Sequence, residues 1–564
     1  MLGVAEIAAE FAAAAENGDL DRVAEWPGAY SAIIIRQGNV TAYTDLAGQF
    51  PLYYSQRDGE ILISPDSVDL AAAHGRGPDP LSAAAHIVCP GVLPLWWGRS
   101  AYSGICRLEG GMTLRARPGC FDIESSRLPW PVPGMSLTEG GARLRAALTE
   151  GVRARCARQR VSADFSGGLD SSAIAFLAAD LSAAPVTSVV YHQPLAPASD
   201  LADAMRLASL TPSIDLSVVR GSARTLPFAG LATGAAEPGA AVAVPPTVVD
   251  WPRAAEPSPR TLSVRRDAAR LAVAAESGAC LHLTGEGGDA VLMAAPSYLA
   301  DLARQRALRA LWRHCGEYAR LRHVGPAALA TSAIRLARTS PGAALQALAG
   351  ELATPAAPST GWTGLISWWP PSDTANWLTG DLRRRLAELA GDPETARVVP
   401  QGAGPADLAA LTDLRRSGDA QRHLRAVGGS CGLAVHAPFL DTAVVRAALE
   451  VPAVTRADPW SYKPMLRSAL TGLVPTALLA RRTKGDYSAE DYRGARRAID
   501  GLRMLLHDSR LADLGVIEPR PVLAVLDRMA AGVAVPLGPL NMLLATEIWL
   551  RSAGGGRNGK QSTC

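Results

Sequence analysis

The segment SGGLDSS (Ser166–Ser172) places glycine, serine and aspartate at a predicted junction between a strand and a helix. The apolar run Val161–Phe165 predicts a buried strand, and Ser172–Leu181 predicts a helix with an apolar face. Ligands of α/β sheets bind at the carboxyl ends of strands, where a glycine turn exposes N–H groups and a helix N-terminus favours anions. The segment is therefore placed where a phosphate group would bind.

The residue types narrow this ligand to a pyrophosphate with its metal. Gly167 and Gly168 open the backbone, and the hydroxyls of Ser166, Ser171 and Ser172 can donate to phosphate oxygens. Asp170 would repel phosphate unless Mg²⁺ lay between them. The segment is not a Walker loop, and Asp164 excludes a nucleophile elbow. The alternative is a tight corner that Asp and Ser side chains cap.

A second glycine-rich segment, HLTGEGGDAV (His282–Val291), follows another predicted strand. Asp289 could complete a Mg²⁺ site with Asp170, and Glu286 could accept a proton from an amine nucleophile. The alternatives are a helix cap for Asp289 and a solvated loop acid for Glu286. We favour the functional interpretation of both because the first loop is present.

Two lysines near the C-terminus could stabilise negative charge on phosphate and on a tetrahedral carbon. Lys484 lies in RRTKGDYS, a glycine-containing loop between predicted helices, and Lys463 lies in YKPMLRSAL. We expect Lys484 to stabilise the transition state and Lys463 to lie near the phosphates. Asp200, in APASDL, either lies near the nucleotide or caps the helix that begins there.

Strands and helices alternate after about residue 137, which predicts a doubly wound parallel sheet. Beyond Ala300 the pattern is mostly helical, with helices expected over Asp301–Arg320, Pro326–Ala349, Asp381–Ala390 and Pro405–Arg425. Before it, residues 29–123 show short strands and turns, with hairpins expected at Gln37–Asn39 and Arg57–Gly59. We expect domains over residues 1–126 and 137–552, a proline-rich linker over 127–136, and a disordered tail over 553–564.

Composition excludes several classes of function. The formal net charge of +3, from 56 basic and 53 acidic residues, gives no nucleic-acid footprint. Eight scattered cysteines without a Cys-x-x-Cys pair indicate a reduced, cytoplasmic protein. The N-terminus lacks the features of a signal peptide, and the apolar stretch Pro227–Val249 contains too much glycine and proline to span a membrane.

Together these segments resemble the asparagine synthetase family of ATP-dependent amide formers. SGGLDSS matches its pyrophosphate-binding PP-loop, TGEGGDAV its second loop, VHAPFLD (Val435–Asp441) its R-V-P-F-L-D, and RRTKGDYS its lysine loop. The resemblance covers about Leu137–Leu550 and implies ATP and Mg²⁺ as cofactors and an acyl-adenylate intermediate. YTDLAGQFPLYYS (Tyr43–Ser55) resembles part of the family's glutaminase domain, an Ntn-type α/β sandwich.

One departure changes the expected nitrogen source. The family's glutaminase domains carry a nucleophilic cysteine directly after the initiator Met, where this chain has Leu2, and its first cysteine is Cys89. We therefore expect the N-terminal domain to be a relic, and the enzyme to join a carboxylate to an amine of its own substrate.

Among the subfamilies, the lasso peptide cyclases, which are macrolactam synthetases, fit best. They share the glycine pair before Asp289, and the segments LRRSGDAQRHLRAVGGSCGLAVHAPFLD, RADPWSYKPMLRSAL and NWLTGDLRRRL resemble theirs. The resemblance implies a linear core peptide as substrate, and a leader-recognition protein and a leader protease as partners. Two other subfamilies fit less well: β-lactam synthetases are expected to carry tyrosine where this chain has Glu286, and asparagine synthetases an acid where it has Ala290. A β-lactam synthetase or another small-molecule amide former and a non-catalytic scaffold remain alternatives. The glycine-rich loop around Glu237 and Pro238, with Trp362, Trp368 and Trp369, could line a peptide chamber, although tryptophans are more often core.

Overall fold

The structure is a computed structural model that describes most of the chain. The described residues are 10, 13, 14, 23, 25–57, 59–117, 120–125, 128–157, 159–194, 196, 198–231, 254–354, 361–369, 373–481 and 488–554. Lys484, Glu237 and Pro238 therefore lie outside the described residues, and so does the tail from residue 555 on. The predicted tail begins two residues too early, because the last helix ends at Gly554.

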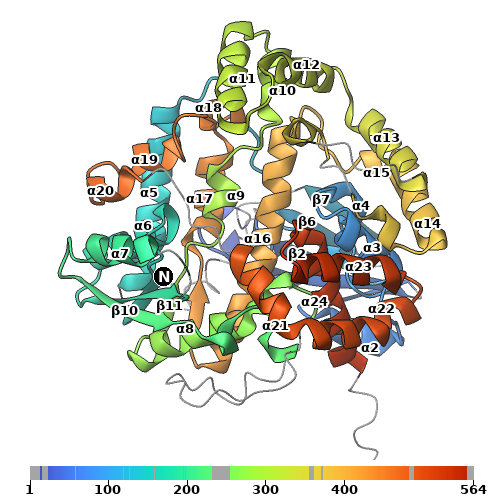
Figure 1. Cartoon of the computed structure of the whole chain (residues 1–564), viewed down its shortest axis with the longest axis horizontal. Coiled ribbons are helices and arrows are strands. Elements are labelled where there is room, and N and C mark those ends of the chain that lie inside the picture. Colours follow the sequence, from blue (N-terminus) through green and yellow to red (C-terminus); the bar gives the residue numbers. More distant parts are fainter. Residues whose placement is uncertain are drawn as a thin grey trace, which may run out of the picture.

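Two antiparallel sheets form the N-terminal part, which is blue in Figure 1. One has the strand order β1-β2-β6-β7 and the other β4-β3-β5, and a small apolar core that includes Ala42 and Leu52 joins them. Their bounds are β1 Ser31–Arg36, β2 Asn39–Thr44, β3 Leu52–Arg57, β4 Glu60–Ser64, β5 Cys106–Leu108, β6 Met112–Arg117 and β7 Cys120–Ser125. Both expected hairpins form: β1 pairs with β2 up to Arg36 and Asn39, and β3 with β4 up to Arg57 and Glu60.

Three helices that the sequence analysis missed interrupt these strands: α2 (Ser67–His74), α3 (Pro80–Val88) and α4 (Leu93–Trp96). Aspartate caps the first two, since Asp66 and Asp79 accept hydrogen bonds from backbone N–H groups in the first turns. The proline-rich connector then leads into α5 (Leu137–Cys156), which Ser136 caps. The connector packs on the second part of the chain, because the N–H of Val132 donates to the carbonyl of Glu450 at 2.7 Å.

A five-stranded parallel sheet forms the centre of the second part, as expected. Its order is β10-β9-β8-β11-β12, with bounds β8 Val161–Asp164, β9 Val186–His192, β10 Ile214–Arg220, β11 Leu281–Leu283 and β12 Ala434–His436. The chain runs outward from β8 to β10 and then returns to β11 on the other side. The strand order thus reverses between β8 and β11, and doubly wound sheets bind their ligands at such a point.

Helices cover both faces of this sheet, as Figure 1 shows. Alternate residues of β9 face opposite cores, with Val186 and Val190 in the large cluster and Val189 in a second cluster with α8 and α16. The helices from α5 on to α16 are α6 Leu169–Leu181, α7 Ala198–Ala208, α8 Val264–Glu276, α9 Gly288–Leu292, α10 Tyr298–Arg304, α11 Leu308–Arg322, α12 Pro326–Ala337, α13 Pro341–Ala353, α14 Gly380–Gly391, α15 Pro393–Ala396 and α16 Pro405–Ser430.

The C-terminal part is helical, as predicted, but two expected helices are each divided in two. The segment expected as Asp301–Arg320 breaks between α10 and α11, where Arg306 has φ 57°. The segment expected as Pro326–Ala349 breaks before Pro341, which has no N–H for a continuing helix and instead begins α13. The remaining helices are α17 Thr442–Leu449, α18 Ala453–Arg456, α19 Pro464–Leu470, α20 Thr476–Leu479, α21 Ser488–His507, α22 Arg510–Asp513, α23 Pro519–Ala530 and α24 Leu537–Gly554. None of the described helices is long and apolar enough to cross a bilayer.

Candidate active site

The first glycine loop joins β8 to α6 at the point where the strand order reverses. The helix begins at Leu169 rather than at the predicted Ser172, so Asp170 lies in its first turn. The hydroxyls of Ser166 and Ser171 lie 2.8 Å apart, and Ser166 Oγ accepts a hydrogen bond from the N–H of Gly168 at 3.1 Å. Gly167 has φ 72°, a conformation that favours glycine.

A cavity of about 320 Å³ lies above this loop. It is lined by Ser166, Gly168 and Ser171, which were predicted to bind pyrophosphate, and by Asp170, a predicted Mg²⁺ ligand. Ser172 does not line the cavity; its side chain is fully buried instead. Only part of the predicted set therefore faces the space where a nucleotide would bind.

The second glycine loop lies against the first because β11 and β8 are neighbouring parallel strands. A Cβ at Gly285 would come within 2.6 Å of the backbone nitrogen of Ser171, and one at Gly288 within 2.7 Å of Asp170 Cγ. Real Cβ atoms do not approach so closely, so side chains at these two positions would push the loops apart. The glycines thus let the two predicted metal ligands come together.

Asp170 and Asp289 converge on a single cation, the ammonium group of Lys463. Its Nζ forms ion pairs with Asp170 and, at 2.6 Å, with Asp289 Oδ1. The side chain of Lys463 is fully buried, and its backbone has φ 50° just before α19. Tyr462 donates a hydrogen bond to Asp289 at 3.2 Å. Lys463 therefore lies at the centre of the site, closer to both acids than the sequence indicated.

This arrangement fits a Mg²⁺ ion that binds together with a nucleotide. Mg²⁺ is usually held by one or two carboxylates plus phosphate oxygens, and Asp170 and Asp289 supply two carboxylates at one point. The described residues include no cluster of three or more His, Cys, Asp or Glu side chains that could hold a metal by themselves. The remaining ligands would have to come from phosphate and water.

Glu286 forms an ion pair with Arg260, which also contacts Asp267 Oδ2 at 3.3 Å. Burial by itself would lower the pKa of Arg260, but Glu286 and Asp267 raise it above the usual value. At the end of β8, Asp164 contacts Arg270 at 2.6 Å and His282 at 3.0 Å. Burial would raise the pKa of Asp164, yet these two partners hold it below the ordinary value. The floor of the cavity is thus a layer of paired charges.

Asp200 lies in the first turn of α7 and also lines the cavity. Arg481 contacts it at 3.5 Å and contacts Asp203 at 3.4 Å. A Cβ at Gly167 would come within 3.0 Å of Arg481 Nη1, so this guanidinium lies directly beside the first loop. The sequence analysis missed Arg481, although it is the first residue of the lysine loop RRTKGDYS.

A second and larger cavity, of about 780 Å³, adjoins the first. Both cavities are lined by Arg260, Glu286, Asp289, Ser417 and Tyr462. The larger one, called the chamber below, is also bounded by α3 of the N-terminal part, by α16 and by α24. Its lining does not include Trp362, Trp368 or Trp369; Trp368 and Trp369 are buried in the core, so assigning these tryptophans to the chamber is wrong.

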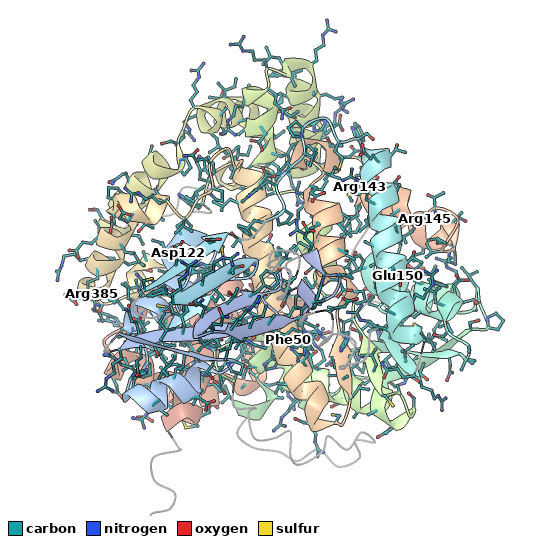
Figure 2. All side chains as sticks on the ribbon, turned by 180° about the vertical axis from the view of Figure 1, so that it is seen from behind. Phe50, Asp122, Arg143, Arg145, Glu150 and Arg385 are labelled. Atoms are coloured by element: carbon teal, nitrogen blue, oxygen red, sulfur yellow. The ribbon has the colours of Figure 1, made fainter. Side chains whose placement is uncertain are left out.

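The two parts of the chain meet along α16, which forms one wall of the chamber. Arg415 is completely buried; it donates to the carbonyls of Leu46 and Gly110 and contacts Glu109 Oε2 at 3.3 Å. Arg425 lies 3.7 Å from the centre of the Phe50 ring, and Phe50 is labelled in Figure 2. Side chains of α16 therefore anchor the N-terminal sheets against the second part.

The comparison with known families agrees with this geometry. The profile of the Asparagine synthase family matches residues 143–551, which include both glycine loops, Lys463 and α16. The chain belongs to the asparagine synthase family. The family assignment implies an ATP-dependent ligase that forms amide bonds. Members of the family use ATP, typically with Mg²⁺. A comparison with curated protein sequences found no match.

The family's VHAPFLD segment has a structural part in this site. Asp441 forms two hydrogen bonds with Arg155 of α5, at 2.6 and 2.7 Å, and both side chains are buried. Leu440 fills the space beside Gly287 of the second loop, where a Cβ would overlap it. The segment thus supports the second glycine loop without lining the smaller cavity.

Proposed function

We propose that this protein is a lasso peptide cyclase, an AMP-forming carbon–nitrogen ligase that closes a macrolactam ring. The observation that carries the proposal is the chamber of about 780 Å³ that shares five lining residues with the nucleotide cavity. A small amino acid needs a tight pocket, whereas a folded peptide needs a chamber open to the activating site. The motif resemblance to lasso cyclases supports the same choice.

In the proposed reaction, a side-chain carboxylate of the peptide attacks the α-phosphorus of ATP, and pyrophosphate leaves. The peptide's N-terminal amine then attacks the activated carbonyl, the C–N bond forms as the amine loses a proton to water, and AMP leaves with the carboxylate oxygen. Ser166, Gly168 and Ser171 would hold pyrophosphate, and Asp170 and Asp289 would hold Mg²⁺, which neutralises phosphate charge when bound. Lys463 lies where it can stabilise the same charge, and Lys484 stays a proposed transition-state residue.

The ion pair of Glu286 with Arg260 changes what we propose for this acid. A carboxylate that an arginine holds is a weak proton acceptor, so Glu286 fits a role in positioning the substrate amine better than one as general base. The chamber must also hold the peptide in its threaded shape before the ring closes, because ordering a free chain costs entropy.

We further propose that the N-terminal part is a glutaminase-like relic, which now serves as a wall of the chamber. Its two antiparallel sheets and the contribution of α3 to the lining support this role. The leader protease and the leader-recognition protein remain proposed partners. The proposed location is the cytoplasm, where ATP is available.

The test is to incubate the purified protein with Mg–ATP and candidate linear core peptides, together with the pathway's protease and recognition protein. A product lighter than the peptide by one water, with AMP and pyrophosphate, supports the cyclase. Loss of that product in Asp170→Ala and Lys484→Ala would tie it to this site. Pyrophosphate release with small amino acids but never with peptides would instead favour a β-lactam synthetase or another small-molecule amide former. If the folded protein turns over no ATP with any substrate, a non-catalytic scaffold would be favoured.

A further inference from the structure

Glu256 differs from the other acids that line the chamber. Its side chain is buried, with 8% of the residue exposed, and its Oε1 accepts a hydrogen bond from the N–H of Ala101 at 3.2 Å. No ion pair to Glu256 exists within the described part of the chain. By contrast, Asp419 contacts Arg107 at 2.8 Å, and Asp289 contacts Lys463 at 2.6 Å. A buried carboxylate without a cation is costly, so this one calls for a partner.

The groups around Glu256 do not supply that partner. The charges of Arg422 and Arg107 act on Glu256 and lower its pKa, but both side chains contact Asp419 instead, at 3.2 and 2.8 Å. The pKa of Glu256 is raised to about 7, chiefly by burial and to a smaller extent by Asp419. Arg422, Arg107 and the hydrogen bond from Ala101 act in the opposite direction but do not offset this rise. Arg107 is also under the influence of Glu109, and neither arginine forms an ion pair with Glu256, so the carboxylate has room for one more positive charge on its chamber side.

The backbone around Glu256 is held in place from two sides. The carbonyl of Ala254 accepts a hydrogen bond from Trp549 Nε1 at 2.9 Å, and that of Ala255 accepts one from Ser67 Oγ at 3.0 Å. Pro257 and Pro259 follow, and four residues beyond Glu256 is Arg260, which pairs with Glu286 at the border of the nucleotide cavity. A fixed, buried carboxylate in the chamber wall is preorganised to bind a charged group.

We propose that Glu256 binds the ammonium group of the substrate in the chamber. The proposal rests on the proposed function in one respect, that this ammonium is the N-terminus of the peptide. Asp413 is the matched control: it also lines the chamber, but its side chain is 56% exposed and lies 3.6 Å from Arg416. Glu256→Gln keeps an oxygen that can accept the Ala101 hydrogen bond, so the change removes the charge and little else.

The first experiment does not depend on the peptide. Thermal unfolding of the wild type, Glu256→Gln and Asp413→Asn is followed at pH 8 with n-hexylammonium chloride, and with n-hexanol as the uncharged probe. We expect hexylammonium to raise the Tm of the wild type and of Asp413→Asn above the effect of hexanol, and to lose this advantage in Glu256→Gln. Equal responses of all three proteins to the two probes would overturn the proposal.

The second experiment uses a candidate linear core peptide, with its N-terminus free or acetylated. Acetylation should weaken peptide binding to the wild type about 10- to 100-fold, as expected for a buried charged contact. It should have no further effect on Glu256→Gln. ATP–pyrophosphate exchange needs only the carboxylate of the peptide. With the acetylated peptide, the exchange should therefore be the same in the wild type and in Glu256→Gln. If the wild type shows no ATP–pyrophosphate exchange, the proposed function is contradicted. If exchange occurs but acetylation weakens peptide binding equally in the wild type and in Glu256→Gln, the role of Glu256 is contradicted.

Discussion

Replacing Arg415 tests whether α16 holds the two parts of the molecule together. Arg415→Met removes a fully buried guanidinium that bonds two backbone carbonyls, those of Leu46 and Gly110, and contacts Glu109. Glu109 is only 2% exposed and would keep a buried charge that has lost this cation. Removing one partner of a buried pair costs about 3–5 kcal/mol, so we expect a fall in Tm of about 3–4 °C for a chain of this length.

The neighbouring arginine of the same helix is the control. Arg416 is 55% exposed, and its contact with Asp413 at 3.6 Å is an exposed pair, so Arg416→Met should cost about 1 kcal/mol or less. The assay is thermal unfolding by near-ultraviolet circular dichroism, with limited proteolysis to show whether residues 25–125 become accessible first. Adding Glu109→Gln to Arg415→Met should restore part of the loss. A Tm of Arg415→Met equal to that of Arg416→Met would refute the reasoning.

Three further predictions concern the site. Lys463→Met should reduce ATP–pyrophosphate exchange by about 100-fold or more, because it removes the buried cation that Asp170 and Asp289 share; near-normal exchange would show that the lysine serves only the fold. Gly285→Ala should raise the KM for ATP, because its Cβ would lie 2.6 Å from the nitrogen of Ser171, whereas Gly429→Ala, which has open space, should leave KM unchanged; equal effects would contradict the close contact of the loops. Glu256→Gln should stabilise the protein more at pH 8 than at pH 5. Since folding raises the pKa of Glu256 from 4.5 to about 7, the folded wild type loses roughly 2–3 kcal/mol of stability between pH 5 and pH 8, and the glutamine variant does not. A difference in Tm between the two proteins that does not change with pH would contradict this prediction.

The sequence by itself determined the class of the fold, and it predicted a chemistry for the two loops. Ser166–Ser172 and His282–Val291 could be interpreted because glycines, hydroxyls and acids at strand ends carry a local signal, and the alternation of strands and helices predicts a parallel sheet. The same local information identified Asp170 and Asp289 as partners and placed α5 directly after the connector. It also identified the family, whose profile matches residues 143–551.

The tertiary structure decided which side chains meet across long separations of sequence. Lys463 lies between Asp170 and Asp289 because α19 packs on α5 and its first residue adopts a left-handed backbone, which no spacing in the sequence reveals. Ser172 faces the core because α6 begins three residues earlier than expected and turns that position inward. Glu256 is buried without a counter-ion because segments from Ser67, Ala101 and Trp549 close around it. Burial and ion pairing depend on the whole packed fold, whereas motifs depend on a few neighbouring residues.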